Sequence, residues 1–116
     1  MEHYNWENLD KEVLNERMWR KIITGEKAMV AQVFIAKGGV VPEHHHDSEQ
    51  LTYILSGALE FEIEGRQVVV SAGEVLRIPS NVPHSAVALE DTLDLDIFSP
   101  IRTDWLTGQD HYLRRG

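Results

Sequence analysis

The chain has 116 residues, no cysteine and a formal net charge of −8, and 42% of its residues are hydrophobic. This length predicts a single domain over residues 1–116. The acidic balance, without a basic stripe, argues against nucleic acid as a partner, and the lack of cysteine excludes disulfides and thiolate chemistry. No apolar run reaches the roughly 20 residues that span a bilayer, and the first residues lack a signal-peptide pattern, so we expect a cytoplasmic protein without membrane contact.

Short strands and tight turns are predicted over most of the chain. Residues 1–28 are expected to add N-terminal strands, although the segment 9–20 taken alone fits either a helical turn or an edge strand. Apolar and β-branched runs that end at Gly, Ser or Pro predict strands at 29–35, 51–55, 58–63, 67–70, 75–78, 84–89 and 92–98. Turns spaced about 8–12 residues apart are typical of a β-sandwich or barrel. Residues 103–113 predict a short helix or a tail.

The strand at 51–55 is apolar on both of its faces. Leu51, Tyr53 and Leu55 point one way and Ile54 points the other. A strand of this kind needs apolar cover on both sides. One cover is the barrel interior, and the other is a second subunit or the N-terminal segment, so we expect a homodimer.

The histidines indicate a metal site. In an extended segment His44 and His46 project to the same face and His45 to the other. With Gln50 at the next strand and His84 at a separate loop, they form a possible site of three imidazoles and one amide. Such ligands suit one divalent transition metal, Mn, Fe, Co, Ni or Zn, with positions left open for water or substrate. A solvated histidine loop is the alternative interpretation.

Two spaced motifs carry a family resemblance. The first reads G-x5-H-x-H-x3-Q-x6-G from Gly38 to Gly57, and the second reads G-x5-P-x-N-x2-H from Gly73 to His84. They resemble the two motifs of the cupin superfamily. The resemblance implies an all-β fold, the cupin double-stranded β-helix or jelly-roll barrel, over about residues 29–102, followed by a short tail at 103–116. Gln50 stands where these motifs often have an acid, so the adjacent Glu49 is an alternative ligand.

The last predicted strand continues into D-x-F-S-P-x-R, from Asp96 to Arg102. Asp94, Asp96 and Phe98 share one face of it, and an exposed edge strand would explain their polarity. The run also resembles the end of KdgF-like cupins, which linearise unsaturated uronates in pectin and alginate degradation. The resemblance implies that Asp96, Phe98 and Arg102 line a pocket beside a metal held by three His and one Gln. The loop at 89–91 is shorter here than in that family.

The residue types suggest distinct roles in such a pocket. Asp96 and Arg102 are the predicted catalytic residues, Asp96 as a proton shuttle and Arg102 as a fork for a carboxylate. Phe98 and Arg102 are the predicted binding residues for a small anionic substrate. We therefore expect a metal-dependent enzyme that converts an unsaturated monouronate, or a related sugar acid, to its linear keto form. The alternatives are an Fe(II)-dependent dioxygenase and a non-enzymatic small-molecule sensor.

Overall fold

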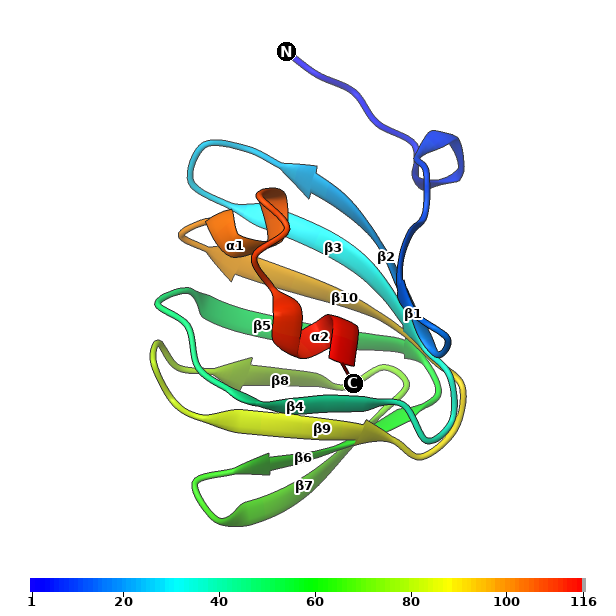
Figure 1. Cartoon of the computed structure of the whole chain (residues 1–116), viewed down its shortest axis with the longest axis vertical. Helices are drawn as coiled ribbons and strands as arrows, with labels where there is room; N and C mark the ends of the chain where they lie inside the picture. Colours follow the sequence, from blue (N-terminus) through cyan, green and yellow to red (C-terminus); the bar gives the residue numbers. More distant parts are fainter. Residues whose placement is uncertain (116) are drawn as a thin grey trace.

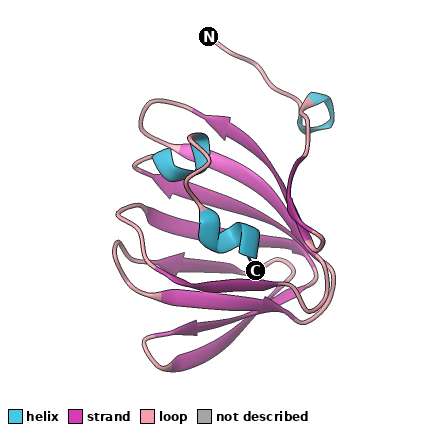
Figure 2. Cartoon of the chain, viewed as in Figure 1, coloured by secondary structure: helices cyan, strands magenta, loops and turns pink. Residues whose placement is uncertain are grey.

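The computed structural model describes residues 1–115, and two antiparallel sheets that face each other make up most of the molecule (Figure 1, Figure 2). The larger sheet has the strand order β1-β2-β3-β10-β5-β8, and the smaller has the order β4-β9-β6-β7. This is the jelly-roll fold that the motifs implied. The strands are β1 (Glu12–Asn15), β2 (Met18–Thr24), β3 (Met29–Ile35), β4 (Val40–His44), β5 (Glu49–Ser56), β6 (Ala58–Ile63), β7 (Arg66–Ser71), β8 (Val75–Ile78), β9 (His84–Ala88) and β10 (Thr92–Ser99).

Within residues 1–115, three short helices lie outside the sheets. They are η1 (Trp6–Asn8), a 3₁₀ helix, and the α-helices α1 (Thr103–Leu106) and α2 (His111–Arg115). In Figure 1 the two α-helices cross in front of the strands, and α2 contacts β1 of the larger sheet and β4 of the smaller one. Among residues 1–115, no helix has the length and apolar character that crossing a membrane requires.

Turn chemistry explains where the strands end. The hairpin between β6 and β7 turns at Glu64 and Gly65, both with positive φ, as a two-residue turn of this hand requires. Gly57, which closes the first motif, has φ +89°. A Cβ there would collide with the backbone of Asp91 and Thr92. The motif glycine therefore lets the start of β6 pass close to the start of β10.

Most strand predictions are confirmed to within two residues, and the ends resolve their open alternatives. Residues 9–20 contribute β1 and the start of β2, so the strand interpretation is correct there and the helical turn is not. The segment 103–113 forms α1 and most of α2. The sequence pattern missed β4, because its residues Val-Val-Pro-Glu-His do not alternate in polarity.

The interior of the barrel is more polar than the pattern suggested. Asp94 and Asp96 point inward from β10 and are only 2% and 8% exposed. β10 lies between β3 and β5, so the interpretation of this strand as an exposed edge is wrong. The apolar set on β5, Leu51, Tyr53 and Leu55, faces outward instead. Apolar residues such as Ile54 and Phe98 complete the core around the polar groups.

Candidate metal centre

Three of the four predicted ligands are histidines that the fold brings together. His44 ends β4, His84 begins β9, and the two are paired across these strands after a register shift. His46 lies beyond the end of β4, in the segment 45–48 that leads to β5. One ring nitrogen from each of the three lies within 4.8 Å of the others. His45 is exposed and is not part of the cluster. His44 and His46 therefore lie on the same side of the chain and His45 does not, as expected for an extended segment.

Backbone contacts orient each imidazole toward the cluster. The Nδ1 atoms of His44, His46 and His84 lie 2.9 Å from the carbonyl oxygens of Pro42, Ser48 and Val82 respectively. A carbonyl only accepts, so each Nδ1 carries the hydrogen and each Nε2 is left with a free lone pair. This arrangement is typical of histidines that ligate a metal through Nε2.

Burial keeps these imidazoles neutral. It lowers the pKa of His44 to about 3, with His84 nearby as the next cause, and lowers the pKa of His46 to about 4, with Arg102 as the next cause. Burial also lowers the pKa of His84. Metal ligation requires the unprotonated ring. The three side chains are therefore in the ligand form at neutral pH.

The fourth predicted ligand, Gln50, aims its oxygen at the same point. Its Oε1 lies 3.0 Å from His46 Nε2. Its amide nitrogen donates to Thr52 Oγ1 at 2.8 Å and to Asp96 at 3.4 Å, which sets the orientation of the amide. Glu49 instead points outward, where its carboxylate pairs with Arg77 at 2.7 Å. The geometry favours Gln50 over Glu49 as a ligand.

The ligand atoms of these four residues fit a divalent cation. His84 Nε2 is buried without a hydrogen-bond partner, and a buried acceptor of this kind is costly unless something binds it. The Nε2 of His46 and the Oε1 of Gln50 are both acceptors, so their close approach is explained by a cation between them. Three neutral imidazoles and an amide suit borderline transition metals, and with four protein ligands an ion of higher coordination number keeps open positions.

Asp96 lies beside this cluster. Thr52 Oγ1 donates to its Oδ1 at 2.8 Å, and the amide of Gln50 approaches the same oxygen. Burial raises the pKa of Asp96 to about 6, and the hydrogen bond from Thr52 limits the rise. A carboxyl group with a pKa near neutrality can both accept and return a proton.

Asp94 is a further buried carboxyl group, for which the sequence suggested no role. It lies two residues before Asp96 on the same inward face and lines the same pocket. Its Oδ1 has no hydrogen-bond partner. Burial, and next the charge of Asp96, raises its pKa well above the ordinary value. The spacing of two aspartates at i and i+2 was the available signal, because both must share a face.

Arg102 reaches the pocket, but its fork is already engaged. Its Nε and Nη2 donate to the carboxylate of Asp104 at 3.0 and 2.8 Å, and Nη2 also donates to the Tyr112 hydroxyl at 2.6 Å. Nη1 is buried without a partner. The guanidinium lies over the Phe98 ring, 5.1 Å from its centroid. The fork predicted for a substrate carboxylate is thus occupied by Asp104, and Nη1 is the free donor.

Two aromatic residues of the site were not identified from the sequence as site residues. Tyr112 stacks on His44 with ring centroids 4.3 Å apart, and Trp105 packs on Phe98. Both come from the C-terminal segment and line the pocket. They are the main aromatic groups in a short polar stretch, which was the only signal of their position.

Comparisons with known proteins identify the family of this chain. The Cupin domain family (Cupin_2) matches residues 31–99. The chain is 36% identical over 98 residues to the pectin degradation protein KdgF of Dickeya dadantii (strain 3937), covering 82% of this chain and 89% of that protein.

Solved structures give the same result. The structure of KdgF from Halomonas sp. superposes with a TM-score of 0.80 at 35% identity, covering 88% of this chain and 96% of that one. An RmlC-like cupin from Shewanella frigidimarina NCIMB 400 superposes with a TM-score of 0.84 at 26% identity, covering 90% and 96% of the two chains. The chain therefore belongs to the cupin family and, within it, is a relative of KdgF.

Proposed function

We propose that this cupin is a metal-dependent enzyme that converts an unsaturated monouronate, or a related sugar acid, to its linear keto form. The observation that carries the proposal is the meeting of Asp96 and Arg102 with the histidine cluster in one pocket. Similarity to KdgF, a pectin degradation protein, supports a uronate as the substrate class. The site thus offers a proton carrier, a cation for a carboxylate and a place for a metal.

The residues divide the chemistry between them. An unsaturated uronate carries a carboxylate, a hemiacetal and an enol ether, and its conversion to a linear ketone requires proton transfers. His44, His46, His84 and Gln50 would hold the metal, which when bound polarises oxygen atoms of the substrate. Asp96, with a pKa of about 6, accepts a proton from one substrate oxygen or carbon and returns it to another.

The remaining residues bind and shield the substrate. Arg102 presents Nη1, a buried donor without a partner, to the carboxylate. The side chain of Phe98 is 1% exposed and forms an apolar wall beneath the guanidinium. Exclusion of water strengthens the attraction between Arg102 and an anion.

The test is the decay of an unsaturated monouronate, followed by the loss of enol absorbance. Wild-type protein should accelerate the decay above the spontaneous rate. Asp96→Asn keeps the shape but cannot accept the proton, so the rate should fall by about 10²–10⁴ with unchanged metal content. Asp10→Asn, the same change on the surface, is the control.

Metal-loaded, folded wild-type protein that accelerates neither pectin-derived nor alginate-derived substrate would refute the uronate assignment. Oxygen consumption by the Fe(II)-loaded protein would then favour a dioxygenase. Binding of a sugar acid without turnover would favour a sensor.

A further inference from the structure

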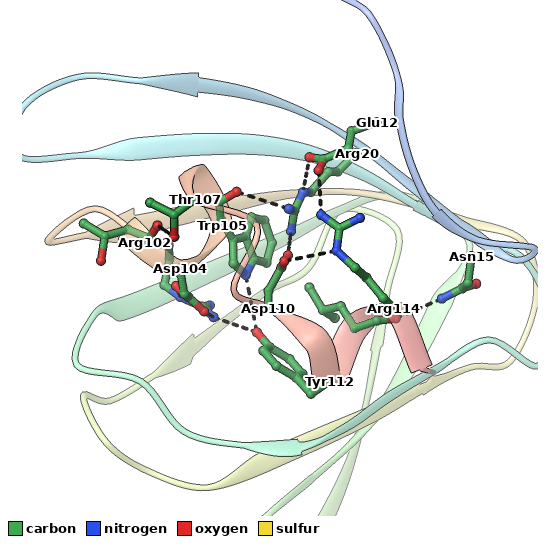
Figure 3. Close-up of polar contacts among 12 residues, drawn as sticks. Glu12, Asn15, Arg20, Arg102, Asp104, Trp105, Thr107, Asp110, Tyr112 and Arg114 are labelled. Carbon is green, nitrogen blue, oxygen red and sulfur yellow. Dashed lines mark hydrogen bonds and ion pairs between the residues drawn. The ribbon is translucent and has the colours of Figure 1, made fainter.

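The C-terminal segment, residues 103–115, is fastened to the start of the chain by buried charges (Figure 3). Arg20 of β2 is fully buried, and it forms an ion pair with Asp110 and another, at 2.8 Å, with Glu12 of β1. Arg114 of α2 lies 2.8 Å from Glu12 and 3.4 Å from Asp110. These four residues, Glu12, Arg20, Asp110 and Arg114, form what we call the latch.

The latch lies apart from the site, but the segment that it fastens enters the site. Arg20 also donates to the carbonyl of Trp105, and its guanidinium lies 4.4 Å from the centre of that ring. Asn15 donates to the carbonyl of Leu113 at 2.9 Å. Tyr112 therefore lies between two anchored neighbours, Asp110 and Leu113, and its position is set by contacts with β1 and β2.

Tyr112 makes two separate contacts inside the site. Its ring stacks on His44 with an interplanar angle of 25°. Its hydroxyl accepts hydrogen bonds from Arg102 Nη2 at 2.6 Å and from Trp105 Nε1 at 3.3 Å. With Asp104 on the other side, Tyr112 leaves only Nη1 of Arg102 free.

The room left under this cover is small. The cavity among the site residues has a volume of about 40 Å³, which holds a few water molecules at most. The C-terminal segment therefore narrows the space beside the histidines.

We propose that Tyr112 is a further positioning residue of this site, that it orients Arg102 through its hydroxyl and covers His44 of the histidine cluster with its ring, and that the latch sets its place. The choice of a carboxylate as ligand rests on the proposed function. The cover and the position of Arg102 rest on the contacts alone.

The hydroxyl is tested with galacturonate, a saturated uronate that carries the carboxylate but cannot react. Tyr112→Phe removes the hydroxyl and keeps the ring. Affinity measured by calorimetry should fall about tenfold, because a hydrogen bond that holds a charged group is lost. With the reactive substrate, KM should rise more than kcat falls. Tyr4→Phe, the same change at an exposed tyrosine near the N-terminus, should leave both values as in wild type.

The ring is tested by extraction of Ni²⁺ from the loaded protein with EDTA. Tyr112→Ala uncovers His44, so the metal should leave about tenfold faster. Tyr112→Phe, whose ring remains, should match wild type. Asp110→Asn, whose side chain pairs with Arg20 and Arg114 and does not line the pocket, breaks the latch and should also speed extraction.

Wild-type galacturonate affinity in folded Tyr112→Phe would overturn the role of the hydroxyl. Wild-type extraction rates in both Tyr112→Ala and Asp110→Asn would overturn the role of the cover. If wild-type protein binds galacturonate without accelerating the decay of the unsaturated sugar, the proposed function fails, while both readouts of Tyr112 remain valid.

Discussion

At the scale of single residues, the charge of the proposed metal ligands determines how strongly a bound ion would polarise a substrate. Three neutral imidazoles and a neutral amide leave the full charge of a divalent ion uncompensated by its ligands, whereas Glu49 in place of Gln50 would cancel one unit. An uncompensated ion is the stronger Lewis acid toward a carboxylate or hydroxyl. The exchange of acid for amide in the motif thus bears directly on the chemistry.

Replacement of single histidines should distinguish the metal ligands from histidines that only lie nearby. His84→Ala should lose most of the bound metal, because the lone pair of its Nε2 is buried and has no hydrogen-bond partner among residues 1–115. His45→Ala is the matched control and should retain the metal, since His45 is exposed. Elemental analysis of the purified proteins measures both, and stoichiometric metal in both variants would contradict the assignment.

The same measurement decides between the two candidate oxygen ligands. Gln50→Ala should reduce metal content, because Gln50 Oε1 faces His46. Glu49→Ala should not, because that carboxylate pairs with Arg77 on the outer face. Loss of metal from the Glu49 variant alone would show that Glu49, and not Gln50, is the oxygen ligand.

Asp94 should make stability depend on pH. Its pKa is raised in the folded protein, mainly by burial. Its contribution to stability is therefore fully present below its unfolded pKa, about 3.9, and is lost as pH rises toward the folded value. Asn cannot ionise, so Asp94→Asn should gain stability over wild type as pH rises from about 4 to 8.

Urea unfolding of the metal-free proteins at several pH values measures this gain. Asp10→Asn, on the surface, serves as the control. A difference between Asp94→Asn and wild type that stays constant across the pH range would contradict the explanation.

At the scale of elements, the sequence predicted where strands lie better than which side faces inward. Apolar runs bounded by turn residues located β3, β6 and β8 to the residue. On β5, however, Gln50 and Thr52 point inward while Leu51 points outward. The usual rule that apolar residues face the core fails there, because the core of this barrel contains the site. The motif spacing, rather than polarity, carried the prediction of the ligands.

The position of the C-terminal segment could not be predicted from sequence patterns, for a different reason. Helices of four and five residues have too few turns to show a periodic pattern. The position of α2 depends on pairs such as Glu12 with Arg114, which are 102 residues apart in the chain. Pairs at that separation leave no local pattern, so Tyr112 could not be assigned to the site from the sequence.

The ion pairs of Asp110 and those of Arg114 should differ in how much they contribute to the free energy of unfolding. Asp110→Asn leaves the fully buried Arg20 with one carboxylate in place of two, and loss of a buried ion-pair partner costs about 3 kcal/mol. Arg114→Gln removes the two pairs that this partly exposed arginine makes with Glu12 and Asp110, and a pair of this kind contributes below about 1 kcal/mol. Urea unfolding measures both, and equal costs would contradict the account of the latch.

At the scale of the whole molecule, we propose that the outer face of the larger sheet joins two copies into a homodimer. Leu51, Tyr53, Val75 and Ile97 are 36–59% exposed. They are neighbours across β10, β5 and β8, since Leu51 is paired with Ile97 and Tyr53 with Val75. A contiguous apolar face of this kind marks a protein interface, and a second copy covers it with an identical face.

Light scattering at micromolar concentration tests the dimer. Wild-type protein should have twice the 13.3 kDa mass of the chain. Tyr53→Glu places a charge in the proposed interface and should give the mass of one chain, with metal content retained. Val13→Glu alters another exposed apolar residue, 68% exposed on β1, and should remain dimeric. A wild-type mass of one chain would refute the proposal.

The origin of the four proposed ligands has a consequence for the thermodynamics of folding. His44 and His84 belong to the smaller sheet, Gln50 belongs to the larger one, and His46 lies on the segment between them. An ion bound by all four is a cross-link between the two sheets that exists only in the folded chain. The melting temperature should therefore climb with the logarithm of metal concentration once the site is near saturation. In calorimetry, that dependence should vanish for His84→Ala and persist for His45→Ala.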